Sequence, residues 1–201
     1  MSNNSNEPSP PKNQHWLWTE TAKTIVLSVI FAFGIRTVAA QAFNVLSGSM
    51  EPTLQIDDRF LVDKITYRFY DPKRGDIIVF SPTEELAKEH YNDAFIKRII
   101  ALPGEKVEIK DGKVYINNQP LAEDKYISPK HKTSLDVCSA SPQSAYLSKP
   151  VTIPPSSYLV LGDNRKRSYD SRCWGVVHRR NIIGRAVLRF WPLNNFGGFD
   201  K

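Results

Sequence analysis

The hydrophobic and polar positions of this 201-residue chain divide it into a polar N-terminus, one long apolar run and a series of short strand-like segments. Residues 1–15 are polar and proline-rich, so they cannot bury enough apolar surface to offset their ordering entropy, and we expect a disordered tail. The apolar run extends from Thr24 to Phe43 and follows Trp16 and Trp18. Its length suits a helix that crosses a bilayer, and tryptophan favours the interface, so the pattern predicts a transmembrane anchor over residues 16–43.

A removable signal peptide is the alternative interpretation of this run. Arg36 interrupts it, and the uninterrupted apolar part, Ile25–Ile35, is as short as the hydrophobic region of a signal peptide. Ala40-Gln41-Ala42 also resembles a cleavage site. Cleavage there would leave Ser49 near a frayed new terminus, which favours the anchor.

Beyond the run, segments rich in β-branched and aromatic residues predict a mostly β domain over residues 44–201. The expected strands are Arg59–Lys64, Asp76–Ser81, Phe95–Ala101, Ser157–Leu161 and Ile182–Trp191. Two alternating segments, Lys106–Lys110 and Lys113–Asn117, flank Asp111-Gly112 and predict a hairpin. Residues 122–155 contain scattered Ser and Pro and are typical of a loop excursion. No segment after the anchor shows a convincing amphipathic helical period.

The charge and the cysteines limit the kinds of binding partner and metal site that the sequence predicts. The net charge of +6 favours anionic surfaces. The basic clusters Arg165–Arg167 and His178–Arg180 lack interleaved aromatics or a nucleic-acid motif, so we expect solvated charge and no nucleic-acid binding. Cys138 and Cys173 do not form a metal-ligand pattern, and no metal is expected. In an oxidising compartment they could form one disulfide, with two free thiols as the alternative.

Candidate chemistry begins at Ser47–Leu54 (SGSMEPTL), directly after the apolar run. A serine hydroxyl is a weak nucleophile at neutral pH and needs a base to take its proton. The histidines offer no good base, because one precedes the span and the others lie in loop-like surroundings without an evident orienting carboxylate. They are His15, His90, His131 and His178.

Lys97 is the better candidate base. In strand alternation it shares a face with Phe95 and Ile99, and burial among apolar groups would keep its amine neutral. A surface lysine on an edge strand is the alternative for this segment taken alone.

Taken together, these segments resemble type I signal peptidases, the Ser/Lys proteases that remove signal peptides from exported proteins. Three blocks carry the resemblance in the family's order: Ser47–Leu54, Arg74–Gly104 and Gly162–Gly175. With the anchor, it covers nearly all of residues 16–192. It implies a mainly β fold, a signal-peptidase-like β-barrel or sandwich domain with one N-terminal transmembrane helix, and it implies no cofactor.

The resemblance also implies roles for individual positions. Ser49 matches the nucleophile and Lys97 the general base. Ser47 matches a hydroxyl that stabilises the oxyanion with the Ser49 backbone N–H, and Ser168 matches the serine that orients the lysine. The remaining matches are structural supports and apolar pocket positions, namely Asp163, Asp170 and Arg172 for support and Val45, Phe95 and Ile96 for substrate binding.

The chain departs from the family pattern at Leu46, where proline is usual, and at Ala101 and Glu105, where glycine and aspartate are common. None of the three is a proposed catalytic group.

The resemblance implies signal peptides of exported precursors as substrates, cut after small residues in an Ala-x-Ala-like pattern. It places residues 1–15 in the cytoplasm and residues 44–201 on the other side of a plasma or thylakoid membrane, in contact with the bilayer and near the secretion translocon. The sequence around Ser171–Gly175 is similar to cyanobacterial or plastid members. The alternatives are a non-catalytic membrane-anchored binding protein on the same fold and a self-cleaving Ser/Lys regulator.

Overall fold

The computed structural model describes residues 14–127, 131–138 and 145–199. The chain divides into two compact units, residues 1–38 and residues 39–201. Residues 1–13 of the expected tail lie outside the described residues, whereas Gln14 and His15, expected in that tail, begin helix α1.

One helix, α1 (Gln14–Ala39), occupies the region of the expected anchor. It ends before Phe43, because Ala40–Asn44 form strand β1 and pair with β2 (Arg59–Asp63). The expected boundary at residue 43 therefore shifts to residue 39. Among the helices that can be assessed in the described parts of the chain, none combines the length and hydropathy that a bilayer-spanning segment requires.

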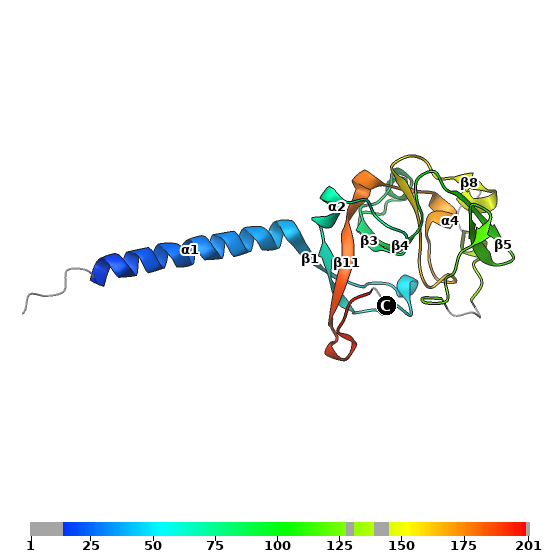
Figure 1. The fold of residues 1–201 in the computed structure, drawn as a ribbon. Helices are drawn as coiled ribbons and strands as arrows, with labels where there is room; N and C mark the ends of the chain where they lie inside the picture. Colours follow the sequence, from blue (N-terminus) through cyan, green and yellow to red (C-terminus); the bar gives the residue numbers. More distant parts are fainter. Residues whose placement is uncertain (1–13, 128–130, 139–144, 200–201) are drawn as a thin grey trace, which may run out of the picture. The chain divides into compact units, whose positions relative to one another are not determined.

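Strands β1 and β2 begin the larger of two antiparallel sheets (Figure 1). Its order is β1-β2-β11-β3-β4-β9-β10. The other strands of this sheet have the residue ranges β11 (Ile182–Trp191), β3 (Ile77–Phe80), β4 (Phe95–Ala101), β9 (Ser157–Leu161) and β10 (Val177–His178). The sequence predicts β4, β9 and β11 with the bounds observed, and β2 and β3 to within one residue at each end. Strand β3 is apolar throughout and β9 nearly so, which fits their burial along the whole strand.

The smaller sheet has the order β7-β6-β5-β8. Its bounds are β5 (Lys106–Lys110), β6 (Lys113–Ile116), β7 (Gln119–Pro120) and β8 (Val151–Thr152). The hairpin expected around Asp111-Gly112 is confirmed as β5 and β6, with both turn residues at positive φ. Strand β8 lies inside the segment 122–155, so that segment is not loop alone.

Short helices complete the described fold. The α-helices are α2 (Thr66–Phe69), α3 (Glu84–Lys88) and α4 (Ser171–Trp174); the 3-10 turns are η1 (Gly48–Met50), η2 (Asp136–Cys138), η3 (Tyr146–Ser148), η4 (Arg179–Asn181) and η5 (Leu193–Asn195). Helix α3 is too short to show a helical period in the sequence. It is capped by the Thr83 side chain, which accepts a bond from the Leu86 backbone, and Leu86 is buried.

The two sheets share a hydrophobic core. Ile100 and Leu159 of the larger sheet cluster with Val107 and Val114 of the smaller one. A second cluster packs Val45, Met50 and Leu54 against the β2, β3 and β11 side of the large sheet. The turn that carries Ser49 is therefore anchored in the core directly after that serine.

Cys138 and Cys173 form a disulfide, which decides between the two alternatives left open by the sequence. Their Cα atoms are 5.2 Å apart, and 35 positions separate them in the chain. The bond joins η2 of the excursion to α4 of the third sequence block. It thereby ties the excursion to the segment that contains Asp170 and Arg172.

Breaking this disulfide should destabilise the domain. The closed loop predicts a loss of about 3–4 kcal/mol in the free energy of unfolding, because the bond restricts the unfolded chain. Urea unfolding of the full chain with and without a thiol reductant measures this loss. The Cys138→Ser/Cys173→Ser variant is the control, since reductant should not change its unfolding curve. Equal curves for the oxidised and reduced wild-type chain would contradict the prediction.

Candidate functional site

Ser49 lies in the 3-10 turn η1, five residues after β1 ends. Val45 and Asp58 hydrogen-bond through their backbones just before the turn, and Met50 and Leu54 are fully buried just after it. The Ser49 side chain is itself buried, with 6% of its surface exposed. Core contacts on both sides therefore hold this short turn in one place.

Lys97 of β4 contacts Ser49, which lies 48 positions earlier in the chain. Its Nζ donates to Ser49 Oγ at 2.8 Å and to the Ile96 carbonyl at 3.0 Å. The lysine is 3% exposed, and its Nζ lies 5.8 Å from the Phe95 ring centroid. The structure thus brings together the two residues that the sequence singles out for nucleophile and base, and it excludes the alternative of a surface lysine.

Burial lowers the pKa of Lys97 from 10.5 to about 8. The negative charges of Asp170 and Asp163 oppose this effect, and the positive charge of Arg172 adds to it. With a pKa of about 8, about a tenth of the molecules carry a neutral amine at pH 7. A neutral amine at this distance can accept the proton of the serine hydroxyl.

Ser47 lies on the exposed side of Ser49. Its hydroxyl donates to Ser49 Oγ at 3.3 Å, and its backbone is extended, with φ −140° and ψ 153°. Gly48 between them packs beneath the Glu51 carboxylate, since a Cβ at Gly48 would lie 3.0 Å from Glu51 Cδ. The chain can therefore present two hydroxyls and a backbone N–H within one turn.

The third sequence block, residues 162–175, packs against the back of this turn. Gly162 touches the Ser49 carbonyl and the Ser168 side chain so closely that an added Cβ would collide with both. Ser168 is buried, and it lies close enough to Asp170 for its hydroxyl to help lower the pKa of that carboxylate, but it makes no hydrogen bond to Lys97 in the described parts of the chain. The predicted contact between Ser168 and Lys97 is thus not seen among the described residues. Ser168 instead lies beside the Ser49 backbone.

Two buried ion pairs fix the block. Arg172 binds Asp170 through Nε at 2.8 Å and Nη2 at 2.9 Å, and Arg98 binds Asp163 through Nε at 2.8 Å and Nη2 at 2.7 Å. Burial alone would raise the pKa of Asp170, but the charge and hydrogen bonds of Arg172 lower it below its ordinary value. The three predicted support residues therefore form ion pairs, and Arg98 is a partner that sequence reasoning missed.

Asn164 is a second residue that sequence reasoning missed, because Gly162-Asp163-Asn164 has the composition of an ordinary turn. Its backbone N–H donates to the Ser49 carbonyl at 3.0 Å, and its side-chain amide donates to the Gly48 carbonyl at 3.0 Å. Nothing in the spacing of the chain signals these contacts. They depend on how residues 162–175 fold back onto the turn.

A cleft of about 350 Å³ opens onto Ser49 and Lys97. Phe95 and Ile96 line it, as expected for substrate positions. Val45, the third predicted substrate position, does not line the cleft. It is 1% exposed and packs in the core beneath the turn. The remaining wall comes from residues on three segments, namely Asn44, Leu46, Ser47, Tyr91, Asp93, Ala94, Arg167 and Tyr169.

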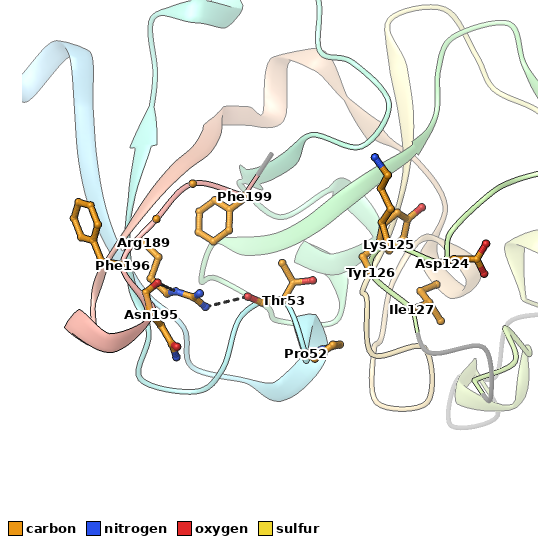
Figure 2. Close-up of a pocket in the computed structure, with 12 residues that line it drawn as sticks. Pro52, Thr53, Asp124, Lys125, Tyr126, Ile127, Arg189, Asn195, Phe196 and Phe199 are labelled. Atoms are coloured by element: carbon orange, nitrogen blue, oxygen red, sulfur yellow. Dashed lines mark hydrogen bonds between the residues drawn. The ribbon is translucent and has the colours of Figure 1, made fainter. Parts of the chain in front are cut away.

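A larger hollow of about 440 Å³ lies elsewhere on the domain (Figure 2). Figure 2 shows Arg189 donating to the Thr53 carbonyl, at 3.1 Å, with Tyr126 and Phe199 on the walls. Neither Ser49 nor Lys97 lines this hollow. Size alone would select it, but the paired hydroxyl and amine make the smaller cleft the candidate active site.

A serine hydroxyl held against a buried, partly neutral lysine on a β scaffold is an arrangement suited to nucleophilic catalysis. The profile described as signal peptidase, peptidase S26, matches residues 18–191. The chain belongs to this signal peptidase family.

Similar proteins carry related names. A signal peptidase I of Leptolyngbya laminosa is 52% identical over 180 residues, which cover 89% of this chain and 82% of that protein. A protein named probable signal peptidase I-2 of Synechocystis sp. is 48% identical over 189 residues, 94% of this chain and 79% of that protein. Thylakoidal processing peptidase 1 of Arabidopsis thaliana is 36% identical over 179 residues, 87% of this chain and 48% of that protein.

Among solved structures, a signal peptidase I from Enterococcus faecalis V583 is 34% identical in sequence. The match covers 58% of this chain and 97% of that chain, with a TM-score of 0.42.

Proposed function

We propose that this protein is a type I signal peptidase of the cyanobacterial kind, a serine endopeptidase that removes N-terminal signal peptides from exported precursor proteins. The observation that carries the proposal is the 2.8 Å contact between the buried Lys97 amine and the Ser49 hydroxyl, in a chain of the signal peptidase family. Neither a non-catalytic binding protein nor a self-cleaving regulator accounts for this pair together with that family membership.

The reaction begins when neutral Lys97 takes the proton of Ser49. The serine oxygen then attacks the carbonyl carbon of the scissile bond, and negative charge develops on the carbonyl oxygen. The Ser47 hydroxyl and the Ser49 backbone N–H donate to that oxygen. Lys97 returns its proton to the leaving nitrogen as the C–N bond breaks, which leaves the signal peptide esterified to Ser49.

The second half of the reaction reverses these roles. Lys97 takes a proton from a water molecule, the water oxygen attacks the ester carbon, and the proton passes to Ser49 as the ester bond breaks. In this proposal Ser168, which lies on the buried side beside the Ser49 backbone, turns its hydroxyl to the lysine only in the substrate complex. The ion pairs of Asp163 and Asp170 keep that side in shape.

The substrate binds in the cleft as an extended strand, because extended peptides can add main-chain hydrogen bonds along a β segment. Phe95 and Ile96 supply the apolar wall beside Lys97. Shallow apolar pockets select small residues at the first and third positions before the cut, in the Ala-x-Ala-like pattern.

The enzyme works at a membrane surface, with residues 1–15 in the cytoplasm and the β domain on the opposite side of a plasma or thylakoid membrane. The apolar sequence up to Ala39 serves as the anchor, and the bilayer and the neighbouring translocon bring precursors to it. Ser49 follows Ala39 by 10 residues, which span at most about 35 Å when fully extended. The Cys138–Cys173 disulfide supports a domain outside the reducing cytoplasm.

Cleavage of a detergent-solubilised exported precursor tests the function. Ser49→Ala should give no mature product, because the nucleophile is lost. Lys97→Ala should lower the rate about 100- to 10,000-fold, because the general base is lost. Ser81→Ala and Lys113→Ala are matched exposed controls and should cleave at the wild-type rate. Mature product from Ser49→Ala at the wild-type rate would exclude Ser49 as the nucleophile, and no product from the wild-type chain would support a non-catalytic role instead.

The pH dependence of cleavage follows from the pKa of Lys97. Below a pKa of about 8 the amine is protonated and cannot accept the serine proton, so kcat/KM should fall about tenfold for each pH unit below it. Above it the rate should reach a plateau. Initial rates from about pH 6 to pH 10, with thermal unfolding measured at each pH, give the profile. A flat profile for a folded enzyme would remove Lys97 as the base.

The anchor is tested by alkaline carbonate extraction of membranes from cells that express the full chain. The full chain should stay in the membrane pellet, because a spanning helix resists removal of peripheral proteins. A variant that lacks residues 1–38 should be released. Release of both forms would exclude a spanning anchor. It would not contradict the proposed Ser49–Lys97 mechanism, which resides in the β domain.

A further inference from the structure

Asn164 contacts the Ser49 turn through both its backbone and its side chain. The backbone N–H donates to the Ser49 carbonyl at 3.0 Å. The side-chain amide donates to the Gly48 carbonyl at 3.0 Å and to Glu51 Oε2 at 3.3 Å. One half-buried residue, distant in sequence, therefore satisfies three acceptors within four consecutive positions of the turn.

The amide lies between two acceptor groups that would otherwise face each other. The Glu51 carboxylate packs over Gly48, where a Cβ would lie 3.0 Å from Glu51 Cδ. The Glu51 carboxylate and the Gly48 carbonyl are both acceptors, so the carboxylate cannot bond to that carbonyl, which also accepts the Glu51 backbone N–H at 3.3 Å. The Asn164 amide donates to both groups, adding a second bond to the carbonyl and holding the carboxylate against the turn.

The loop that carries Asn164 is itself fixed to the strand that carries Lys97. Asp163, the preceding residue, forms the buried ion pair with Arg98, which follows Lys97 in β4. Arg165, the next residue, is buried and donates to the Gly162 carbonyl at 3.0 Å. A short path of hydrogen bonds and ion pairs therefore connects the Ser49 turn to the backbone beside the lysine.

We propose that Asn164 is a positioning residue that sets the distance between the Ser49 hydroxyl and the Lys97 amine, and that Glu51 is its side-chain partner. The inference rests on the proposed function, because it assumes that Ser49 is the nucleophile. It adds a residue from the third sequence block, and a carboxylate from the first, to the groups on which the rate depends.

The substitution Asn164→Asp tests this proposal with almost no change in size. It keeps the backbone bond to Ser49 but replaces the donating amide by a carboxylate, which repels both Glu51 and the Gly48 carbonyl. Misplacing the hydroxyl should lower kcat about 10- to 100-fold while KM stays within about twofold, because the apolar wall of the cleft, Phe95 and Ile96, lies on β4 and not on the turn. Asn118→Asp makes the same chemical change at an exposed turn and should keep the wild-type kcat.

A second substitution distinguishes positioning from general loss of structure. In the Asn164→Asp/Glu51→Gln variant, the glutamine amide can donate to the new carboxylate and restore one contact. We expect kcat to recover by at least about fivefold relative to Asn164→Asp. If Asn164→Asp does not fold, Asn164→Ala removes the donor without adding charge and should lower kcat about tenfold. Thermal unfolding of each variant shows that the rates belong to folded protein.

Either of two results would overturn the proposal: a kcat for folded Asn164→Asp within twofold of wild type, or no recovery on adding Glu51→Gln. Ser49→Ala in the same assay separates this inference from the proposed function. If Ser49→Ala still cleaves, the assignment of Ser49 as the nucleophile in the proposed function fails. If Ser49→Ala is inactive while Asn164→Asp keeps the wild-type kcat, the function stands and only the role of Asn164 is rejected.

Discussion

The burial of the Lys97 amine against the Ser49 hydroxyl is the constraint on which the rest of the site depends. Shifting the pKa of the lysine from 10.5 to about 8 costs about 3 kcal/mol of folding free energy below pH 8, and this cost disappears as the pH rises towards 10.5. The domain supplies that free energy through the packed core around β4 and the turn η1. The chemistry is therefore available only in a fold that tolerates a buried, partly neutral amine.

The ion pairs around Lys97 fix the positions of the residues they join more than they stabilise the fold. A buried ion pair gains little net free energy, because the attraction between the charges is offset by the loss of their hydration. The Arg98–Asp163 and Arg172–Asp170 pairs nevertheless remain, and each is almost completely buried. The Arg98–Asp163 pair joins residues 162–175 to β4, whereas the Arg172–Asp170 pair lies within that block and fixes its shape. Their carboxylates also oppose the lowering of the lysine pKa by burial.

Local patterns predict the elements that are regular and apolar. Strands β4, β9 and β11 are runs of β-branched and aromatic residues, and the β5–β6 hairpin has an Asp-Gly turn, so each is visible in the sequence. Strands β1 and β8 are not, because β1 continues an apolar run of helical length and β8 has only two residues. Pairing with neighbours, β2 for one and β5 for the other, makes them strands.

The sequence by itself determined the mostly β fold, the resemblance to a protease family and the identity of the serine and lysine, because these follow from local composition and from motifs in a fixed order. Only the tertiary structure decided the Cys138–Cys173 pairing, the core position of Val45, the position of Ser168 beside the Ser49 backbone, and the partners Arg98 and Asn164. Each of these depends on segments far apart in the chain meeting in space, and spacing along a sequence carries no information about such distances.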